Sequence, residues 1–321
     1  MKKLITNVAA IILATSLITS CRKNDTIENP TDLYDNLKVT NQSMRQLFTV
    51  NVGSGGNITG TGGSKITFPP NFAVNTNGTA YTGNAIVEVK ESIWRKNWMM
   101  DGVSATAQND ILISGGMLNL EVTRTDNGAE LLPAPAMQVP NTNLSAVIRA
   151  EMPRNPNLLN VSMNLFVPDS SAVGTNAPVL AWRTALNFPF NNGPNSYIFQ
   201  LPKFKWVNCD KLYDQPGPKT TIRITPDITA FAGATDVQAL LVYRNLSSVI
   251  SLPLKPGFFE SYINSIPVGS QADCVLIGKA ADGKILFKVI AANTFTALQN
   301  ITITPEIVAG ATVQAYLESI N

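Results

Sequence analysis

Few side chains in this sequence are of the kinds that usually perform chemistry. The 321 residues include no histidine and three cysteines, Cys21, Cys209 and Cys274. The lack of histidine excludes Ser-His-Asp and Cys-His arrangements and the HExxH zinc motif. Paired carboxylates or a lysine stay possible as catalytic groups, but no spacing identifies a catalytic set. We therefore expect a protein that is not an enzyme and that uses no metal and no cofactor.

Cys21 ends an N-terminal export signal. Two lysines precede a mostly apolar run at residues 4–18, and Thr19-Ser20-Cys21 follows. This layout is typical of a secretory signal, and the run is shorter than the roughly 20 residues of a spanning helix. Residues 18–21 resemble the lipobox of bacterial lipoproteins, whose signal peptidase cleaves before the cysteine. The resemblance implies a signal peptide at residues 1–20 and a covalent lipid on Cys21, with acyl chains such as palmitate.

The same resemblance implies a location. Several acyl chains hold a protein on a bilayer without a spanning helix. Arg22 stands where an aspartate retains enterobacterial lipoproteins in the inner membrane, which favours the outer membrane. Lys23 and Asp25 match the acidic cluster of surface-exposed Bacteroidota lipoproteins only in part. The periplasmic and cell-surface faces therefore both stay open.

Composition favours an exported β protein. Charged residues make up 14% and hydrophobic residues 45% of the chain, which is typical of β-rich secreted proteins. The 20 prolines and 21 glycines are spread along the chain and favour short strands joined by turns. Removing residues 1–20 deletes two lysines and leaves 22 basic against 22 acidic residues. A neutral mature chain has no basic footprint for nucleic acid.

Strand and turn patterns predict an all-β fold with two sandwich-like modules, of Greek-key or immunoglobulin-like type. Residues 21–43 are polar and without a sustained period, so we expect a flexible tether. An N-terminal β-sandwich module is expected at 44–142, linking β segments at 143–207, and a C-terminal β-sandwich module at 208–321. The glycines at 53–56 and 60–63 precede a strand rather than a helix, which indicates hairpin turns rather than a phosphate loop.

Several motifs resemble a known module. Residues 63–72 (Gly-Ser-Lys-Ile-Thr-Phe-Pro-Pro-Asn-Phe) and the strand at 83–89 look like the β-sandwich module shared by ankyrins, netrin receptors and zonula occludens proteins. They look still more like a divergent version in Bacteroidota outer-membrane lipoproteins, which also carry an Ile-Ser-Gly-Gly-Met strand, here 113–117. A Trp-x-Asn-Cys-Asp segment follows in them, here 206–210. The resemblance implies a scaffold for protein contacts, and no catalytic residue carries over.

The C-terminal part contains an internal echo. Residues 224–228 and 237–240 (Ile-Thr-Pro-Asp-Ile and Val-Gln-Ala-Leu) are matched by 303–307 and 313–316 (Ile-Thr-Pro-Glu-Ile and Val-Gln-Ala-Tyr). A duplicated strand–turn–strand unit would produce this echo, and so would chance in a chain rich in Thr and Ala.

A binding candidate lies at residues 93–100. Trp94 and Trp98 flank Arg95 and Lys96. The two indoles beside two cations would suit a sugar-stacking platform or a partner-binding loop. The alternative is a strand end whose aromatic side chains cover an open sandwich edge.

Two pairs of aspartates are weaker candidates. Asp101 with Asp110, or Asp273 with Asp282, would form a calcium site or a hydrolytic pair if they met in space. No Asp-x-Asp-x-Asp spacing supports this, and solvated turn aspartates explain them better.

The remaining cysteines are a disulfide candidate. Cys209 and Cys274 are an even pair in an exported chain, and a bridge between them would be worth about 4 kcal/mol on the chain-entropy argument. The alternative is two buried free thiols that pack as small apolar residues.

Together these features predict a lipid-anchored cell-envelope protein that acts as a non-catalytic binding or structural component. Its expected partners are the membrane, through the anchor, and an envelope protein or a glycan. The alternative is a glycan-binding accessory lipoprotein of a polysaccharide-uptake system, with Trp94 and Trp98 against sugar rings.

Overall fold

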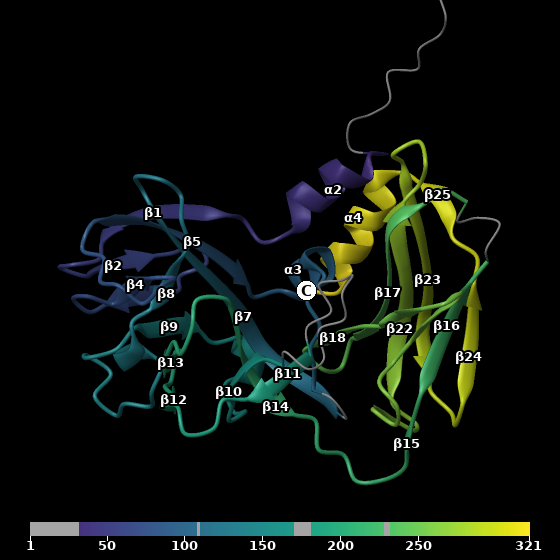
Figure 1. Cartoon of the computed structure of the whole chain (residues 1–321). Helices are drawn as coiled ribbons and strands as arrows, with labels where there is room; N and C mark the ends of the chain where they lie inside the picture. Colours follow the sequence, from purple (N-terminus) through teal and green to yellow (C-terminus); the bar gives the residue numbers. More distant parts are fainter. Residues whose placement is uncertain (1–31, 108–109, 170–180, 228–231) are drawn as a thin grey trace, which may run out of the picture.

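The computed structural model describes residues 32–107, 110–169, 181–227 and 232–321. Their fold is all-β, as the sequence predicted. Figure 1 shows two lobes of strands, with short α-helices gathered between them. These helices are α2 (Tyr34–Asn41), α3 (Arg95–Asp101) and α4 (Gly310–Ser319), and two 3₁₀ turns lie at η2 (Pro135–Met137) and η3 (Pro156–Leu158).

The first lobe is a sandwich of a seven-stranded and a five-stranded sheet. The seven-stranded sheet runs β1 (Gln46–Asn51), β5 (Asn84–Ser92), β7 (Asp110–Arg124), β14 (Trp206–Leu212), β10 (Asn164–Pro168), β11 (Ala181–Thr184) and β6 (Thr106–Ala107). The five-stranded sheet runs β12 (Phe190–Asn192), β13 (Ser196–Gln200), β9 (Arg149–Pro153), β3 (Lys65–Phe68) and β2 (Gly56–Thr59). A separate ribbon joins β4 (Ala73–Asn75) to β8 (Leu131–Pro133).

The second lobe pairs a five-stranded with a four-stranded sheet. The five-stranded sheet runs β18 (Ser248–Ser251), β17 (Thr235–Tyr243), β22 (Gln271–Lys279), β23 (Ile285–Thr294) and β25 (Glu306–Val308). The four-stranded sheet runs β19 (Leu254–Lys255), β20 (Phe258–Glu260), β16 (Ile222–Pro226) and β24 (Gln299–Ile303). A short ribbon joins β15 (Lys219–Thr220) to β21 (Ile266–Pro267).

Burial follows the side-chain period differently in the two lobes. In β5, Ala85, Val87 and Val89 face the first core while the alternate residues stay half-exposed. In β22 both faces are buried from Ala272 to Gly278. The sheet that contains β22 therefore lies between two apolar layers, which explains its continuous apolar runs.

The second of these layers joins the two sandwiches. One face of the β17–β22 sheet packs on the four-stranded sheet, and its other face packs on the helices and on the first sandwich. Trp182 of β11 and Trp98 of α3 lie in this shared layer with Val242 of β17. The two sandwiches are thus fused through a common core rather than joined as independent modules.

The predicted tether is wrong where the structure describes it. Residues 34–41 form helix α2, in which Tyr34 and Leu37 are buried in the shared core. Asn41 lies on the same face, and its Nδ2 donates to Gln314 Oε1 of α4 at 2.9 Å. Tyr34, Leu37 and Asn41 lie at helical spacing, and their contacts hold this segment in place although its composition is polar. The predicted signal peptide and residues 21–31 of the predicted tether, Cys21 included, lie outside the described residues.

The predicted module boundaries also need correction. Residues 143–207 are not linkers, because β9, β10, β11, β12 and β13 complete the two sheets of the first sandwich. β14, which begins at Trp206, belongs to the same sandwich through its pairing with β7. The first sandwich thus ends at Leu212, and the second begins at β15.

The internal echo does not mark a duplicated unit. β16 and β24 do share a sheet as parallel neighbours, with Ile224 opposite Ile301. The second half of the echo diverges, because 237–240 lies in strand β17 and 313–316 lies in helix α4.

Candidate functional site

The two tryptophans of the binding candidate occupy different environments. Trp94 is the N-cap of α3 and is 45% exposed, whereas Trp98 has 0% exposure inside the shared core. The Trp98 indole donates from Nε1 to the Ser92 carbonyl at 2.6 Å. A platform made of both indoles is therefore wrong, because α3 turns Trp98 inward between the sandwiches. Trp94 alone faces solvent.

Arg95 connects the two lobes through hydrogen bonds of its side chain. Its Nη1 donates to the carbonyls of Tyr243, Arg244 and Leu246 in the turn after β17, at 2.8, 3.0 and 3.3 Å. Burial lowers the pKa of the Arg95 guanidinium, and the nearby charge of Arg244 lowers it further. Arg95 is thus engaged with protein carbonyls. Lys96 contributes its backbone N–H, which donates to Asn321 Oδ1 at 3.2 Å.

A cavity of about 250 Å³ opens beside Trp94, where the two sandwiches meet. Beside Arg95, Arg244 and apolar side chains, its lining includes the indole, side-chain amides and one hydroxyl from four separate stretches of chain: Trp94, Asn155, Asn157, Asn245, Ser247 and Asn321. Amides both donate and accept hydrogen bonds, so this lining can satisfy a ligand rich in hydroxyl groups. The sequence indicated Trp94, but only the fold brings the asparagines to it.

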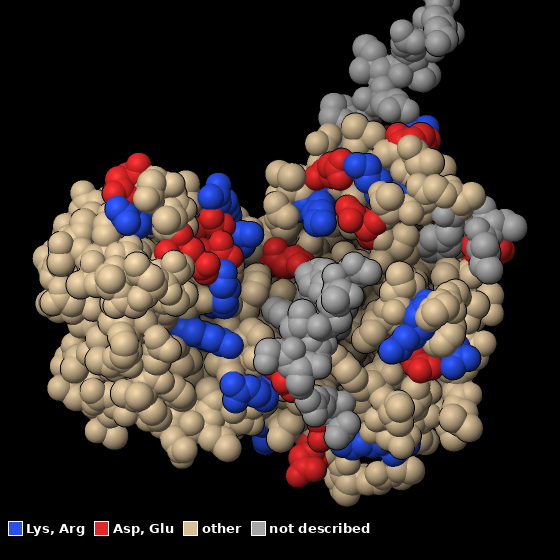
Figure 2. Space-filling model, viewed as in Figure 1, with Lys and Arg blue, Asp and Glu red and all other residues tan. Residues whose placement is uncertain are grey.

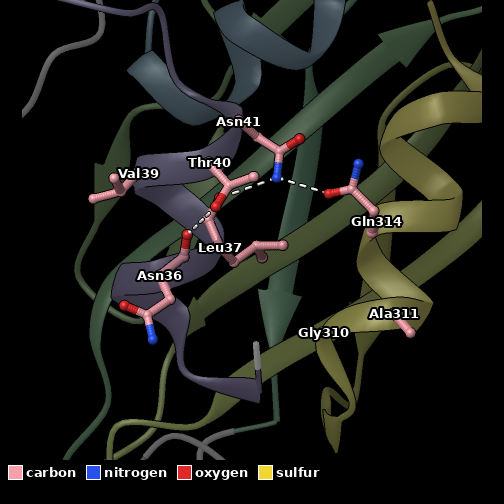
Figure 3. Close-up of a pocket in the computed structure, with 8 residues that line it drawn as sticks. All are labelled: Asn36, Leu37, Val39, Thr40, Asn41, Gly310, Ala311 and Gln314. Carbon is pink, nitrogen blue, oxygen red and sulfur yellow. Dashed lines mark hydrogen bonds between the residues drawn. The ribbon is translucent and has the colours of Figure 1, made fainter. Parts of the chain in front are cut away.

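A second, larger hollow lies between α2 and α4, with a volume of about 590 Å³ (Figure 3). Figure 3 shows Asn41 and Gln314 pointing toward each other across it, joined by the hydrogen bond described above. Leu37, Val39 and Ala311 supply apolar lining. The hollow is built from the helices that hold the two sandwiches together.

A buried polar network links the two motifs of the lipoprotein resemblance. Ser114 lies on β7 and Asn208 and Asp210 on β14, where an extra residue in β7 forms a β-bulge at Gly115 and Gly116. Ser114 Oγ donates to Asn208 Oδ1 at 2.9 Å, and Asn208 Nδ2 donates to Asp210 Oδ2. Burial raises the pKa of Asp210 well above its ordinary value, and this effect outweighs the lowering of the pKa by the polar neighbours Ser114 and Asn208.

A second buried carboxylate, Glu91, is held by the glycine-rich loop between β2 and β3. The backbone N–H groups of Gly62 and Ser64 donate to its carboxylate, each at 2.7 Å, and Gln46 Nε2 donates at 3.0 Å. A side chain at Gly60 would overlap this carboxylate. The sequence identified the glycines as turn residues but did not indicate their carboxylate partner.

The predicted disulfide is wrong, since Cys209 and Cys274 are free and buried. Cys209 faces the core of the first sandwich, and Cys274 faces the core between the sheets of the second. Burial raises the pKa of both thiols, and that of Cys274 reaches about 12. The two cysteines belong to different cores, so their strands cannot bring them together.

The aspartate pairs of the sequence are engaged separately. Asp101 accepts hydrogen bonds from Ser43 and Ser92, and Asp110 pairs with Lys219 at 2.5 Å. Asp273 accepts from Arg244 Nε at 2.8 Å and from the Tyr316 hydroxyl at 3.1 Å, and Asp282 pairs with Lys284 at 3.0 Å. Across the described ranges, no group of three or more Cys, Asp or Glu residues is arranged to hold a metal ion.

Figure 2 shows that acidic and basic side chains are interspersed on the face it presents, within a largely uncharged surface. In the part of the chain that the structure describes, no helix has the length and apolar character needed to cross a membrane. No protein-family model matches this chain, and no curated protein matches it at a significant level.

Proposed function

We propose that this chain is a lipid-anchored, non-catalytic binding protein of the Gram-negative cell envelope, held at the outer membrane through Cys21. The observation that carries the binding role is the amide-lined cavity beside Trp94. Its amide, hydroxyl and indole groups suit recognition of a ligand rather than a chemical step. The anchor rests on the export signal and on the lipobox-like residues 18–21.

A glycan is the ligand class that this cavity favours, as in an accessory lipoprotein of a polysaccharide-uptake system. An exposed indole can pack against the apolar face of a sugar ring while its rim stays hydrated. Asn155, Asn157 and Asn245 surround that indole with groups that pair with sugar hydroxyls. The resemblance to a scaffold module supports the other partner class, an envelope protein.

Binding to a glycan array tests whether the cavity beside Trp94 recognises a glycan. The wild-type protein should bind a restricted set of glycans, and Trp94→Ala should abolish that signal. Leu298→Ala, which removes an exposed apolar side chain away from the cavity, is the matched control and should keep it. If no glycan is bound, or if Trp94→Ala binds as well as the wild type, the glycan role is wrong. Cross-linking in native envelopes then identifies a protein partner.

The anchor has its own test. Cys21→Ala should leave the protein uncleaved or soluble and without incorporated palmitate, since no thiol remains at the lipobox-like position. Cys209→Ala should keep both the label and the membrane fraction. A Cys21→Ala protein that still incorporates labelled palmitate would exclude this anchor.

A further inference from the structure

A third cavity, of about 360 Å³, opens at one end of the first sandwich. Arg183 of β11 and Lys203, which follows β13, lie on its lining. Val167, Ala185 and Phe188 line it as well, and all three border the apolar core of this sandwich. The cavity therefore combines two cationic groups with an apolar wall. It shares no lining residue with the cavity beside Trp94.

Arg183, which is exposed, and Lys203, which is half-buried, differ in their partners from the half-buried Arg95 and Arg154. Arg95 donates to three carbonyls, and Arg154 donates to the carbonyls of Gly193, Leu158 and Val161 at 2.7, 3.0 and 3.1 Å. Within the described ranges, neither the Arg183 guanidinium nor the Lys203 ammonium makes a hydrogen bond or an ion pair. Both groups keep their donors for a partner from outside the chain.

The sequence limits what else could neutralise them. The internal stretches that the structure leaves undescribed, 108–109, 170–180 and 228–231, contain no Asp and no Glu. Burial lowers the pKa of Lys203, and the charge of Arg183 lowers it further. Two like charges at a partly desolvated site repel each other and attract an anion.

We propose that this cavity binds a small organic carboxylate, with the carboxylate between Arg183 and Lys203 and an apolar body against Val167, Ala185 and Phe188. The guanidinium fork matches a carboxylate in two-point geometry, and the ammonium adds a second charge. Leu186, which is 73% exposed at the rim, and Pro202 extend the apolar wall toward solvent. The volume falls at the small end of the range for ligand sites, which suits a ligand with one ring or a short chain.

Titration calorimetry with matched probes tests this site. Benzoate and hexanoate should bind the wild-type protein, whereas benzamide and hexanamide, which have the same shape without the charge, should not. Inorganic phosphate should bind at least tenfold more weakly than benzoate, because it gains nothing from the apolar wall. Benzoate binding should weaken as the salt concentration rises.

Variants that remove the charge but keep the aliphatic part of the side chain test whether Arg183 and Lys203 bind the carboxylate. Arg183→Gln and Lys203→Met should each weaken benzoate binding about tenfold or more, and the double variant should abolish it. Lys65→Met removes an exposed cation from β3 of the same sandwich and should leave binding unchanged. All four variants should keep the wild-type circular dichroism, since none of the changed groups makes a hydrogen bond or an ion pair in the described structure.

Three results would overturn the proposal: no binding of either carboxylate, equal binding of benzamide and benzoate, or equal binding of phosphate and benzoate. Retained binding in the double variant would do the same. None of these outcomes bears on the Trp94 cavity, which is tested with glycans.

Discussion

The buried carboxyl groups of Glu91 and Asp210, both in the first sandwich, have opposite surroundings. Glu91 receives three hydrogen bonds, two of them from backbone N–H groups of the glycine loop. Asp210 has a side-chain donor on Oδ2, whereas its Oδ1 has no hydrogen-bond partner in the described structure. Burial of a carboxylate is offset only where donors converge on it. The Glu91 carboxyl group thus has its hydrogen-bond donors supplied by the fold, whereas the burial of Asp210 favours its protonated form.

The largest effect is expected at Glu91. Glu91→Ala leaves the N–H groups of Gly62 and Ser64 without their acceptor, so it should destabilise the protein by about 3 kcal/mol in urea unfolding. Glu88→Ala, on the same strand, removes only ion pairs with Arg45 and Lys90 on the outer face of the sheet and should cost less than about 1 kcal/mol. Equal losses in the two variants would show that the glycine loop does not depend on Glu91.

The next largest loss of stability is expected in the glycine-rich loop between β2 and β3. Gly60→Ala adds a methyl group that would overlap the Glu91 carboxylate, and overpacking of this kind costs about 2 kcal/mol. Gly56→Ala is the control, because its added methyl group would meet only Val50 at 3.4 Å. Thermal unfolding should show a lower Tm for Gly60→Ala than for Gly56→Ala. The reverse order would contradict the tight fit of the loop around Glu91.

The raised pKa of Asp210 should make the free energy of unfolding depend on pH. Its pKa is raised in the folded state, so the unfolded chain releases the proton first as the pH rises above the ordinary value. Stability from this group is complete at low pH and falls by up to about 1.4 kcal/mol per pH unit until the folded-state pKa is reached. The Asp210→Asn side chain cannot ionise, so its variant should lack this pH dependence. The stability of the variant should therefore rise relative to that of the wild type as the pH rises.

Urea unfolding between pH 4.5 and pH 7 measures the difference between the two proteins. Asp214→Asn changes an exposed aspartate nearby and should follow the wild type. Parallel curves for Asp210→Asn and the wild type would mean that Asp210 is ionised in the folded protein.

The smallest effect is expected at the cysteines. Reductant should leave the Tm unchanged, because no bridge joins Cys209 to Cys274. Burial raises the pKa of both thiols, so alkylating reagents at pH 8 should modify them only after unfolding. Peptide mass spectrometry can assign each modification. Fast labelling of Cys209 in the native protein would mean that the region around its neighbour Asp210 opens to solvent.

Local sequence was a good guide where one period dominates. The strands expected at 83–89 and 113–117 appear in the structure as parts of β5 and β7. Helix α2 was missed because only Tyr34 and Leu37 supply its apolar stripe. The sites were predicted only in part: Trp94 was found from its residue type, but Asn155, Asn245 and Asn321 reach it from distant parts of the chain.

The sequence by itself determined the β class, because alternation and turn residues act over a few neighbouring positions. It could not determine the state of the Val-Gln-Ala segments, which form a strand at Val237 and a helix at Val313. In the strand, Ala239 and Leu240 bury opposite faces between two apolar layers. In the helix, Val313 and Leu317 bury one face against the shared core. Long-range burial decides between the two states, since local propensity differs by only a fraction of a kcal/mol per residue.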